Sequence, residues 1–169
     1  DSIFKISALT SVDAIDNAEV QGASLFGLSN VESEIEAHTM SKIRMDGAIL
    51  ENNSGDIYLT AKTDSKIHSN SDLLTVYLIG GSADSNAYSA VYADNLIEVQ
   101  DTNIKANNVN IYAGKDSHDV SNVLETVADA DITSISITPN FASPDSVMTT
   151  EEFNIIDIQG LSRIEAMQD

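Results

Sequence analysis

Three histidines are the side chains of this sequence best suited to binding a metal ion. His38, His68 and His118 offer imidazole nitrogens of the kind that ligate zinc. His68 and His118 follow similar motifs, "KTDSKIHS" and "GKDSHDVS", but they are offset after alignment and neither has a second histidine two or four residues away. A structural zinc site needs four ligands close together. We therefore interpret all three as polar loop residues and predict no metal-binding residue.

Acidic residues recur in sets that could supply oxygen ligands to calcium. The sets are Asp13 with Asp16, Glu32 with Glu34 and Glu36, Asp116 with Asp119, and Asp129 with Asp131. We expect each set to lie on one face of a strand or turn. No segment matches the twelve-residue calcium loop or the Gly-Gly-x-Gly-x-Asp repeat of calcium-binding β-rolls. Solvated acidic faces are the preferred interpretation, so no cofactor is predicted, and weak calcium binding is the alternative.

Signatures of other catalytic chemistry are missing from the sequence. It has no Cys and no Gly-x-Ser-x-Gly motif, and "IGGSADSN" (79–86) lacks the Lys and Thr of a phosphate-binding loop. A pectate-lyase-like enzyme acting on polysaccharides is the catalytic alternative. It is disfavoured because there is no Trp, aromatic residues are only 5%, and the eight Lys and Arg residues are scattered. We therefore predict no catalytic residue and no enzymatic activity.

The composition predicts an acidic globular protein. Eight Lys and Arg against 27 Asp and Glu give a formal charge of −19, and 42% of the residues are hydrophobic. Such a charge repels nucleic acid and anionic lipid. No apolar run is long enough to span a bilayer, so we expect no membrane insertion. The first residues, "DSIFKIS", lack a signal-peptide pattern and an initiator Met. We expect a mature product or an excised piece, and the lack of Cys is compatible with an exported protein.

A block near the middle of the sequence is repeated further on. Residues 56–65 read "DIYLTAKTDS" and residues 108–117 read "NVNIYAGKDS", with a blurred copy, "IFKISALTS", at 3–11. Aligned alanines in these copies, Ala8, Ala61 and Ala113, are 53 and 52 residues apart. A fixed period of this kind indicates a repeat architecture.

A second apolar segment recurs with nearly the same period. It reads "IRMDGAIL" at 43–50, "IEVQDTNI" at 97–104, and "IDIQGLSRI" at 156–164 with one extra residue. The chain therefore divides into three units, 1–54, 55–107 and 108–169.

Apolar residues alternate with polar ones inside each unit, which predicts strands with one buried face. We expect strands of about five residues, joined by turns such as "ENNSGD", "GGSADSN" and "AGKDS". Residues 29–40 are predicted as a strand, and long loops are predicted at 79–95 and 137–152. The predicted fold is all-β: a right-handed parallel β-helix (β-solenoid) of three superrepeats of about 53 residues, with two or three coils in each unit.

Stacking of equivalent strands predicts which side chains fill the interior. The residues predicted to point inward are Ile57, Leu59, Ala61, Val109, Ile111 and Ala113. Leu59 is expected to stack directly against Ile6 and Ile111, or one coil removed from them. The three aligned alanines are expected to mark a bend or a tight interior corner.

Unit three carries a resemblance to a known class of protein. "NVNIYAGKDS", "NVLETVADADITSISITP" and "SVMTTEEFNIIDIQGLSRIEA" are similar to the repeats of the large exported bacterial filamentous adhesins of the filamentous-haemagglutinin and leukotoxin type. The resemblance extends over all three units and is weakest in unit one, where "ISALTSVD" lacks the Tyr-Ala-Gly. It implies a β-helical surface protein and brings no catalytic residues.

These observations lead to an expected function. We expect an extracellular or cell-surface structural repeat that forms a stiff stalk or fibre of a bacterial adhesin or matrix protein. The expected partner is the chain itself, head to tail, or the neighbouring repeats of a longer chain, because "RIEAMQD" followed by "DSIFKISA" restores the repeat. The alternative is a module that binds glycans or other cell-surface proteins through its long loops. No nucleic-acid partner is expected.

Overall fold

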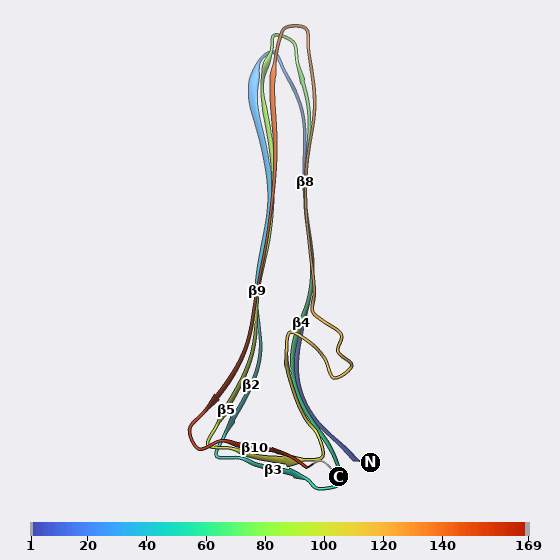
Figure 1. Ribbon diagram of the computed structural model, residues 1–169. Coiled ribbons are helices and arrows are strands. Elements are labelled where there is room, and N and C mark those ends of the chain that lie inside the picture. Colours follow the sequence, from blue (N-terminus) through green and yellow to red (C-terminus); the bar gives the residue numbers. More distant parts are fainter. Residues whose placement is uncertain (1, 168–169) are drawn as a thin grey trace.

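The computed structural model describes residues 2–167, which form ten β-strands and no helix (Figure 1). The strands are β1 (Ser2–Ser24), β2 (Gly27–Asp46), β3 (Ile49–Asn52), β4 (Gly55–Tyr77), β5 (Gly81–Gln100), β6 (Asn103–Ala106), β7 (Val109–Ala113), β8 (Val123–Ser136), β9 (Phe141–Gln159) and β10 (Arg163–Ala166). The all-β prediction is confirmed. So is the strand predicted at 29–40, which lies within β2.

The named strands pair in parallel and form three sheets. The first contains β1, β4, β7 and β8, the second β2, β5 and β9, and the third β3, β6 and β10. Consecutive strands enter different sheets, except β7 and β8, which both pair with β4, and the chain returns to the first sheet after β3 and after β6. Residues 2–52, 55–106 and 109–166 therefore each make one coil, meaning one passage through the three sheets. These long, stacked parallel strands are consistent with a β-solenoid-like fold.

The predicted strand length and the predicted number of coils in a unit are wrong. The five longest strands have 19 to 23 residues rather than about five, so each unit makes one coil rather than two or three. The segments 79–95 and 137–152, predicted as long loops, lie mostly in β5 and β9. Their Ser, Asn and Asp residues alternate between the two faces of a strand instead of forming turns. Even Pro144 lies inside β9, at a sheet edge where a missing N–H is tolerated.

The predicted register of the repeated blocks is confirmed. Pairing across the sheets produces three interior columns, each with one residue from every coil: Ile6–Leu59–Ile111, Ala8–Ala61–Ala113 and Ile43–Ile97–Ile156. Ala8 and Ala61 lie within the continuous strands β1 and β4, so the prediction that the alanines mark a corner is wrong for these two coils. A mid-strand alanine instead lets the two facing sheets approach each other.

A hydrophobic core fills the wide end of the molecule, where the three sheets enclose a triangle (Figure 1). Its buried residues are Ile43, Met45, Ile57, Leu59, Ala61, Ile97, Val99, Ile104 and Ala106. The residues predicted to point inward in the central coil are completely buried. Val109 and Ile111 pack against the same core but are only half-buried, because the third coil lies at one end of the stack. We call this end the base.

The rest of the molecule is a long, narrow arm made of the first two sheets (Figure 1). Its interior is lined largely by small residues, and the hydroxyl groups among them bond to the facing sheet. Ser69 Oγ donates to the carbonyl oxygen of Ser33 at 2.7 Å, and Ser85 Oγ donates to that of Ser71 at 2.7 Å. Buried hydroxyl groups are tolerated when they are hydrogen-bonded in this way. Serine therefore serves here as a small interior residue, and this explains how a polar segment forms a long strand.

Candidate functional site

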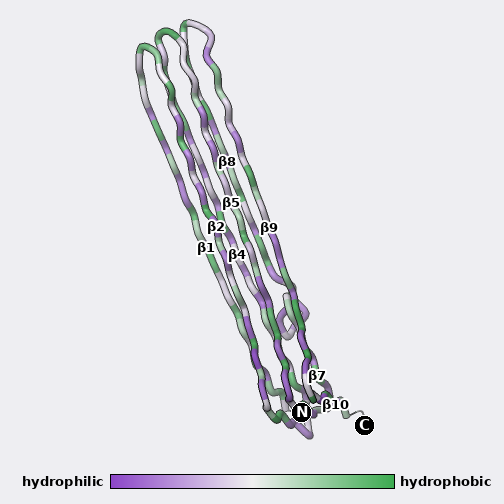
Figure 2. The backbone as a smooth tube through the Cα atoms, turned by 90° about the vertical axis from the view of Figure 1, so that its left-hand side faces the viewer, coloured by the Kyte–Doolittle hydropathy of each residue, from purple (hydrophilic) through white to green (hydrophobic). Residues whose placement is uncertain are grey.

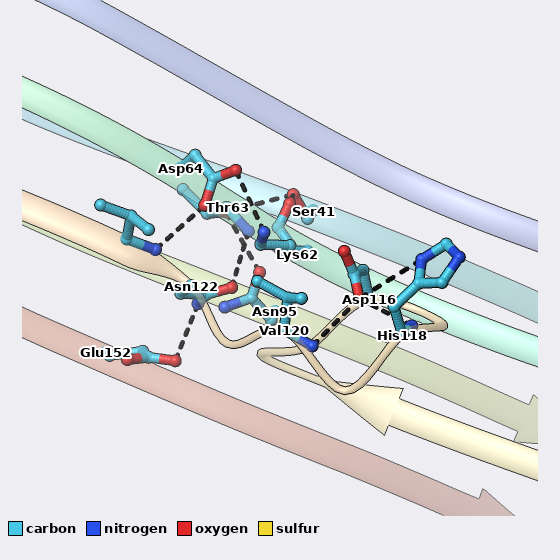
Figure 3. A network of polar contacts seen from close by, with 11 residues as sticks. Ser41, Lys62, Thr63, Asp64, Asn95, Asp116, His118, Val120, Asn122 and Glu152 are labelled. Carbon is cyan, nitrogen blue, oxygen red and sulfur yellow. Dashed lines mark hydrogen bonds and ion pairs between the residues drawn. The ribbon is translucent and has the colours of Figure 1, made fainter.

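A network of buried polar side chains crosses the interior where the arm joins the base (Figure 3). Ser41, Thr63 and Asn95 are each at most 1% exposed, although they come from three different strands. Ser41 Oγ donates to the carbonyl oxygen of Lys62 at 2.7 Å, and Thr63 Oγ1 donates to Asn95 Oδ1 at 3.1 Å. Asn95 Nδ2 in turn donates to Asn154 Oδ1 at 2.9 Å in the next coil. The network links all three coils.

Side chains next to this network replace the backbone hydrogen bonds that the first sheet loses where the third coil leaves it. Between β7 and β8 the chain loops away from β4, and Asn122 and Asp64 take over the missing strand contacts. Asn122 Oδ1 accepts a hydrogen bond from the Thr63 N–H at 3.0 Å, and Asp64 Oδ1 accepts one from the Val123 N–H at 2.9 Å. Asn122 Nδ2 donates to Glu152 Oε1 at 2.7 Å. The buried backbone near this gap thus keeps its hydrogen bonds.

The loop 114–122 is held by a carboxylate that the sequence offered as a calcium ligand. Asp116 Oδ1 accepts hydrogen bonds from the backbone N–H groups of His118, at 2.8 Å, and Val120, at 3.1 Å. These two bonds hold the pKa of Asp116 below its ordinary value, because they favour the charged form. Asp119 lies 2.8 Å from Lys115 Nζ, and this contact raises the pKa of Lys115. Both carboxylates are used to fix the loop.

The three histidines lie on three different elements. His38 is on the outer face of β2, His68 is exposed on β4, and His118 is in the loop 114–122. The His38 ring stacks on Tyr92 with 4.6 Å between centroids, and its Nε2 is 2.7 Å from Glu36 Oε1. Within residues 2–167, no group of three or more His, Cys, Asp or Glu side chains is arranged to hold a metal ion.

The outer face around His38 carries a perturbed tyrosine. A side-chain hydrogen bond with Tyr88, together with partial desolvation, raises the pKa of Tyr92 to about 12. Tyr92 is therefore neutral at any physiological pH. Its ring stacks on His38 in this neutral form.

Of the four predicted acidic sets, two lie on a single strand face, one lies in the loop 114–122, and one is divided between two faces. Glu32, Glu34 and Glu36 all point outward from β2, and Asp129 and Asp131 both point outward from β8, as predicted.

Asp13 and Asp16 lie on opposite faces of β1, so that prediction is wrong. Residues three apart in a strand point to opposite sides. Asp13 is exposed, whereas Asp16 is half-buried in the arm and accepts a hydrogen bond from Ser33 Oγ at 2.7 Å. Asp16 is thus an interior residue of the arm.

The parallel register stacks like charges on the outer face of the first sheet. Glu19, Asp72 and Asp131 are direct neighbours across β1, β4 and β8. Adjacent strands lie about 4.8 Å apart, so these carboxylates repel one another. Another column on the same face contains both signs of charge. In it, Lys66 lies between Asp13 and Glu125 and is 3.3 Å from the Glu125 carboxylate. The predicted recurrence of negative charge along the stack is confirmed at the first column.

Asp72→Asn is expected to raise the melting temperature in low salt, because it removes the central charge of the Glu19–Asp72–Asp131 column. The gain should be about 0.2–1 kcal/mol and should shrink as sodium chloride screens the column. Thermal unfolding followed by circular dichroism at low and high salt measures it. Glu125→Gln is the matched control, since it removes a charge that faces Lys66 and should not stabilise the fold. A rise in melting temperature for both variants would mean that the effect comes from net charge alone.

Sequence reasoning did not identify the buried network, although the sequence contains a signal for it. Asn95 and Asn154 each stand two residues before an aligned isoleucine, Ile97 or Ile156. A polar residue repeated in register with an apolar column indicates an interior position.

Comparisons with known proteins found no relatives. No protein-family model, curated protein or solved structure matches the chain. None of the described residues belongs to a helix that could cross a membrane.

Proposed function

We propose that the chain is an extracellular structural repeat, a right-handed parallel β-helix segment that forms a stiff stalk or fibre of a bacterial surface adhesin or matrix protein. The observation that supports this proposal is the pairing of whole coils in register. β2 and β5 pair without interruption from Gly27 opposite Gly81 to Asp46 opposite Gln100. A residue in one coil therefore meets its equivalent in the next, as in a protein that grows along one axis.

The proposed role is mechanical. Hydrogen bonds between parallel strands run along the stack, so tension or bending acts on many bonds at once. The apolar columns of the base and the buried network of Ser41, Thr63 and Asn95 tie successive coils together from the inside. The resemblance to filamentous adhesins supports the same role, and so does the acidic surface, which keeps neighbouring fibres apart.

The partner in this proposal is more of the same structure. β1, β2 and β3 form one edge of the three sheets, and β8, β9 and β10 lie at the other edge. Open strand edges are templates for further pairing. The interior columns can also continue, because Ile156 and Ile158 at one end correspond in register to Ile43 and Met45 at the other. Neighbouring repeats of a longer chain or identical copies stacked head to tail both satisfy these edges.

Electron microscopy of tandem fusions tests the proposal. Each copy should add three coils, or about 14 Å at 4.8 Å per coil, so in fusions of two, four and eight copies the dimension along the stacking axis should rise in proportion to copy number. Matched fusions with a long Gly-Ser linker between copies interrupt the direct chain connection, so a continuous stack in these fusions would show that separate copies also pair head to tail. Eight-copy fusions without the linker that look like separate beads would contradict a continuous stalk.

A further inference from the structure

One end of the arm differs from the rest of this acidic protein because it carries no charge. The turns that join the first sheet to the second lie in three segments without a single charged residue: 20–31, 73–83 and 132–144. Acidic residues bound every segment, in pairs Glu19 and Glu32, Asp72 and Asp84, and Asp131 and Asp145. Figure 2 shows the three turns side by side at the end of the arm, far from the base. We call these three segments together the apolar tip.

Large apolar side chains are exposed on every side of the apolar tip. Leu78 and Ile137 line one hollow on the outer face of the first sheet, and Phe26 and Ile79 are exposed at the turns. Leu28, which is 87% exposed, points outward into solvent from the second sheet. Soluble proteins rarely leave a contiguous apolar surface of this kind without a binding partner.

Hydrogen bonds join the central turn of the apolar tip to the turns on either side of it. The Leu78 N–H donates to the Ser24 carbonyl at 3.0 Å, and the Gly80 N–H donates to Ser136 Oγ at 3.0 Å. The Tyr77 hydroxyl donates to Ser29 Oγ at 2.8 Å, inside the turn. These bonds lower the cost of moving the turns out of bulk water, while the open edges of the first and third coils keep hydrogen bonds to water in the hydrated interfacial region.

We propose that the apolar tip inserts into the interfacial region of a zwitterionic lipid bilayer. Exposure on all sides fits an occupant that can surround the tip, as acyl chains do, whereas a folded partner could cover only one side. Leu78 lies six positions after Asp72, or about 20 Å along the strand at about 3.3 Å per residue. Interfacial segments enter a bilayer by only about 5–10 Å, so the bounding carboxylates stay in water.

The charge of the protein selects the lipid. A net charge of −19 repels anionic headgroups, whereas a neutral headgroup leaves the apolar contact unopposed. The sequence expectation of no membrane insertion rested on the charge of the whole chain and on the lack of a spanning segment, and the tip is a local exception to both arguments. This proposal does not depend on the role of the chain as a stalk.

A single tryptophan tests the location of the bilayer contact, because the natural chain has none. Phe26→Trp should show a blue-shifted emission on addition of phosphatidylcholine vesicles, and brominated acyl chains should quench it. Ile15→Trp, on the outer face of β1 and 66% exposed, is the control and should show neither change. Equal responses from both positions, or no response from Phe26→Trp, would overturn the proposal.

Vesicle flotation with two matched triple variants tests the energetics. The tip variant is Phe26→Ser, Ile79→Ser and Ile137→Ser, and the control variant is Leu9→Ser, Ile15→Ser and Ile49→Ser, all at exposed positions. The tip variant should partition onto phosphatidylcholine vesicles more than about tenfold less than the natural chain, and the control should partition normally. Equal partitioning of both variants would overturn the proposal. A second result would also overturn it: self-association in the absence of lipid that the tip variant abolishes and the control variant does not. A second copy of the chain would then be what covers the tip.

Discussion

Leu59→Ala is expected to lower the free energy of unfolding by about 2–5 kcal/mol, the usual effect of truncating a large aliphatic side chain in a rigid core. Leu59 is completely buried in the central coil and lies between Ile6 and Ile111. The neighbouring coils hold it on two sides, so the cavity left by the substitution cannot collapse easily. Urea denaturation followed by circular dichroism measures the change.

Leu9→Ala is the matched control for this experiment. Leu9 lies in β1, in the same sheet as Leu59, but its side chain points outward and is 67% exposed. Its truncation should change the free energy of unfolding by no more than about 0.5 kcal/mol. If both substitutions had the same effect, β1 and β4 could not have the inward and outward faces described above.

Asn95→Asp should destabilise the protein by about 3–5 kcal/mol at neutral pH, because it places an uncompensated carboxylate in the interior. The substitution keeps the shape of the side chain and replaces the Nδ2 donor with an acceptor. That donor now bonds Asn154 Oδ1, and the other amide atom accepts from Thr63. Chemical denaturation at neutral pH gives the magnitude.

Asn17→Asp separates the effect of burial from that of added charge. Asn17 is exposed on the outer face of β1, opposite Asn70. Its substitution by Asp is the same chemical change, placed at the surface. Its effect should stay within about 0.5 kcal/mol. A small effect at both positions would mean that water reaches the network and that the three coils are not tied together through Asn95.

The sequence alone determines the register of this fold but not its proportions. Repeated apolar residues align the coils correctly because an in-register parallel stack places equivalent side chains together. Ala61 and Ile97, for example, each lie beside their equivalents in the neighbouring coils, as alignment of the repeats predicts. Strand length could not be predicted in this way. Serines such as Ser69 and Ser85 have turn-forming chemistry, and only the facing sheet, with its carbonyl oxygens, makes them interior residues.

The candidate site shows the same division. Asp116 was correctly singled out as a carboxylate in a turn, but its partners are backbone N–H groups that sequence spacing does not reveal. Asn122 fills a gap in the first sheet that exists only because the third coil loops away from β4. The apolar tip could have been found from the sequence, since its three uncharged segments recur with the period of the repeat.

The pairing of each strand with its equivalent about one repeat away also determines how the chain must fold. Among residues 2–167, no two of the ten strands that pair are close neighbours in sequence; Ser2 already meets Gly55. The first contact between coils therefore closes a long loop, and the entropy lost in that closure opposes it with no local hairpin to help. Once one coil is in place, its open edge presents every hydrogen-bonding group that the next coil needs. Folding is thus expected to start slowly and then to proceed quickly by templating, one coil at a time.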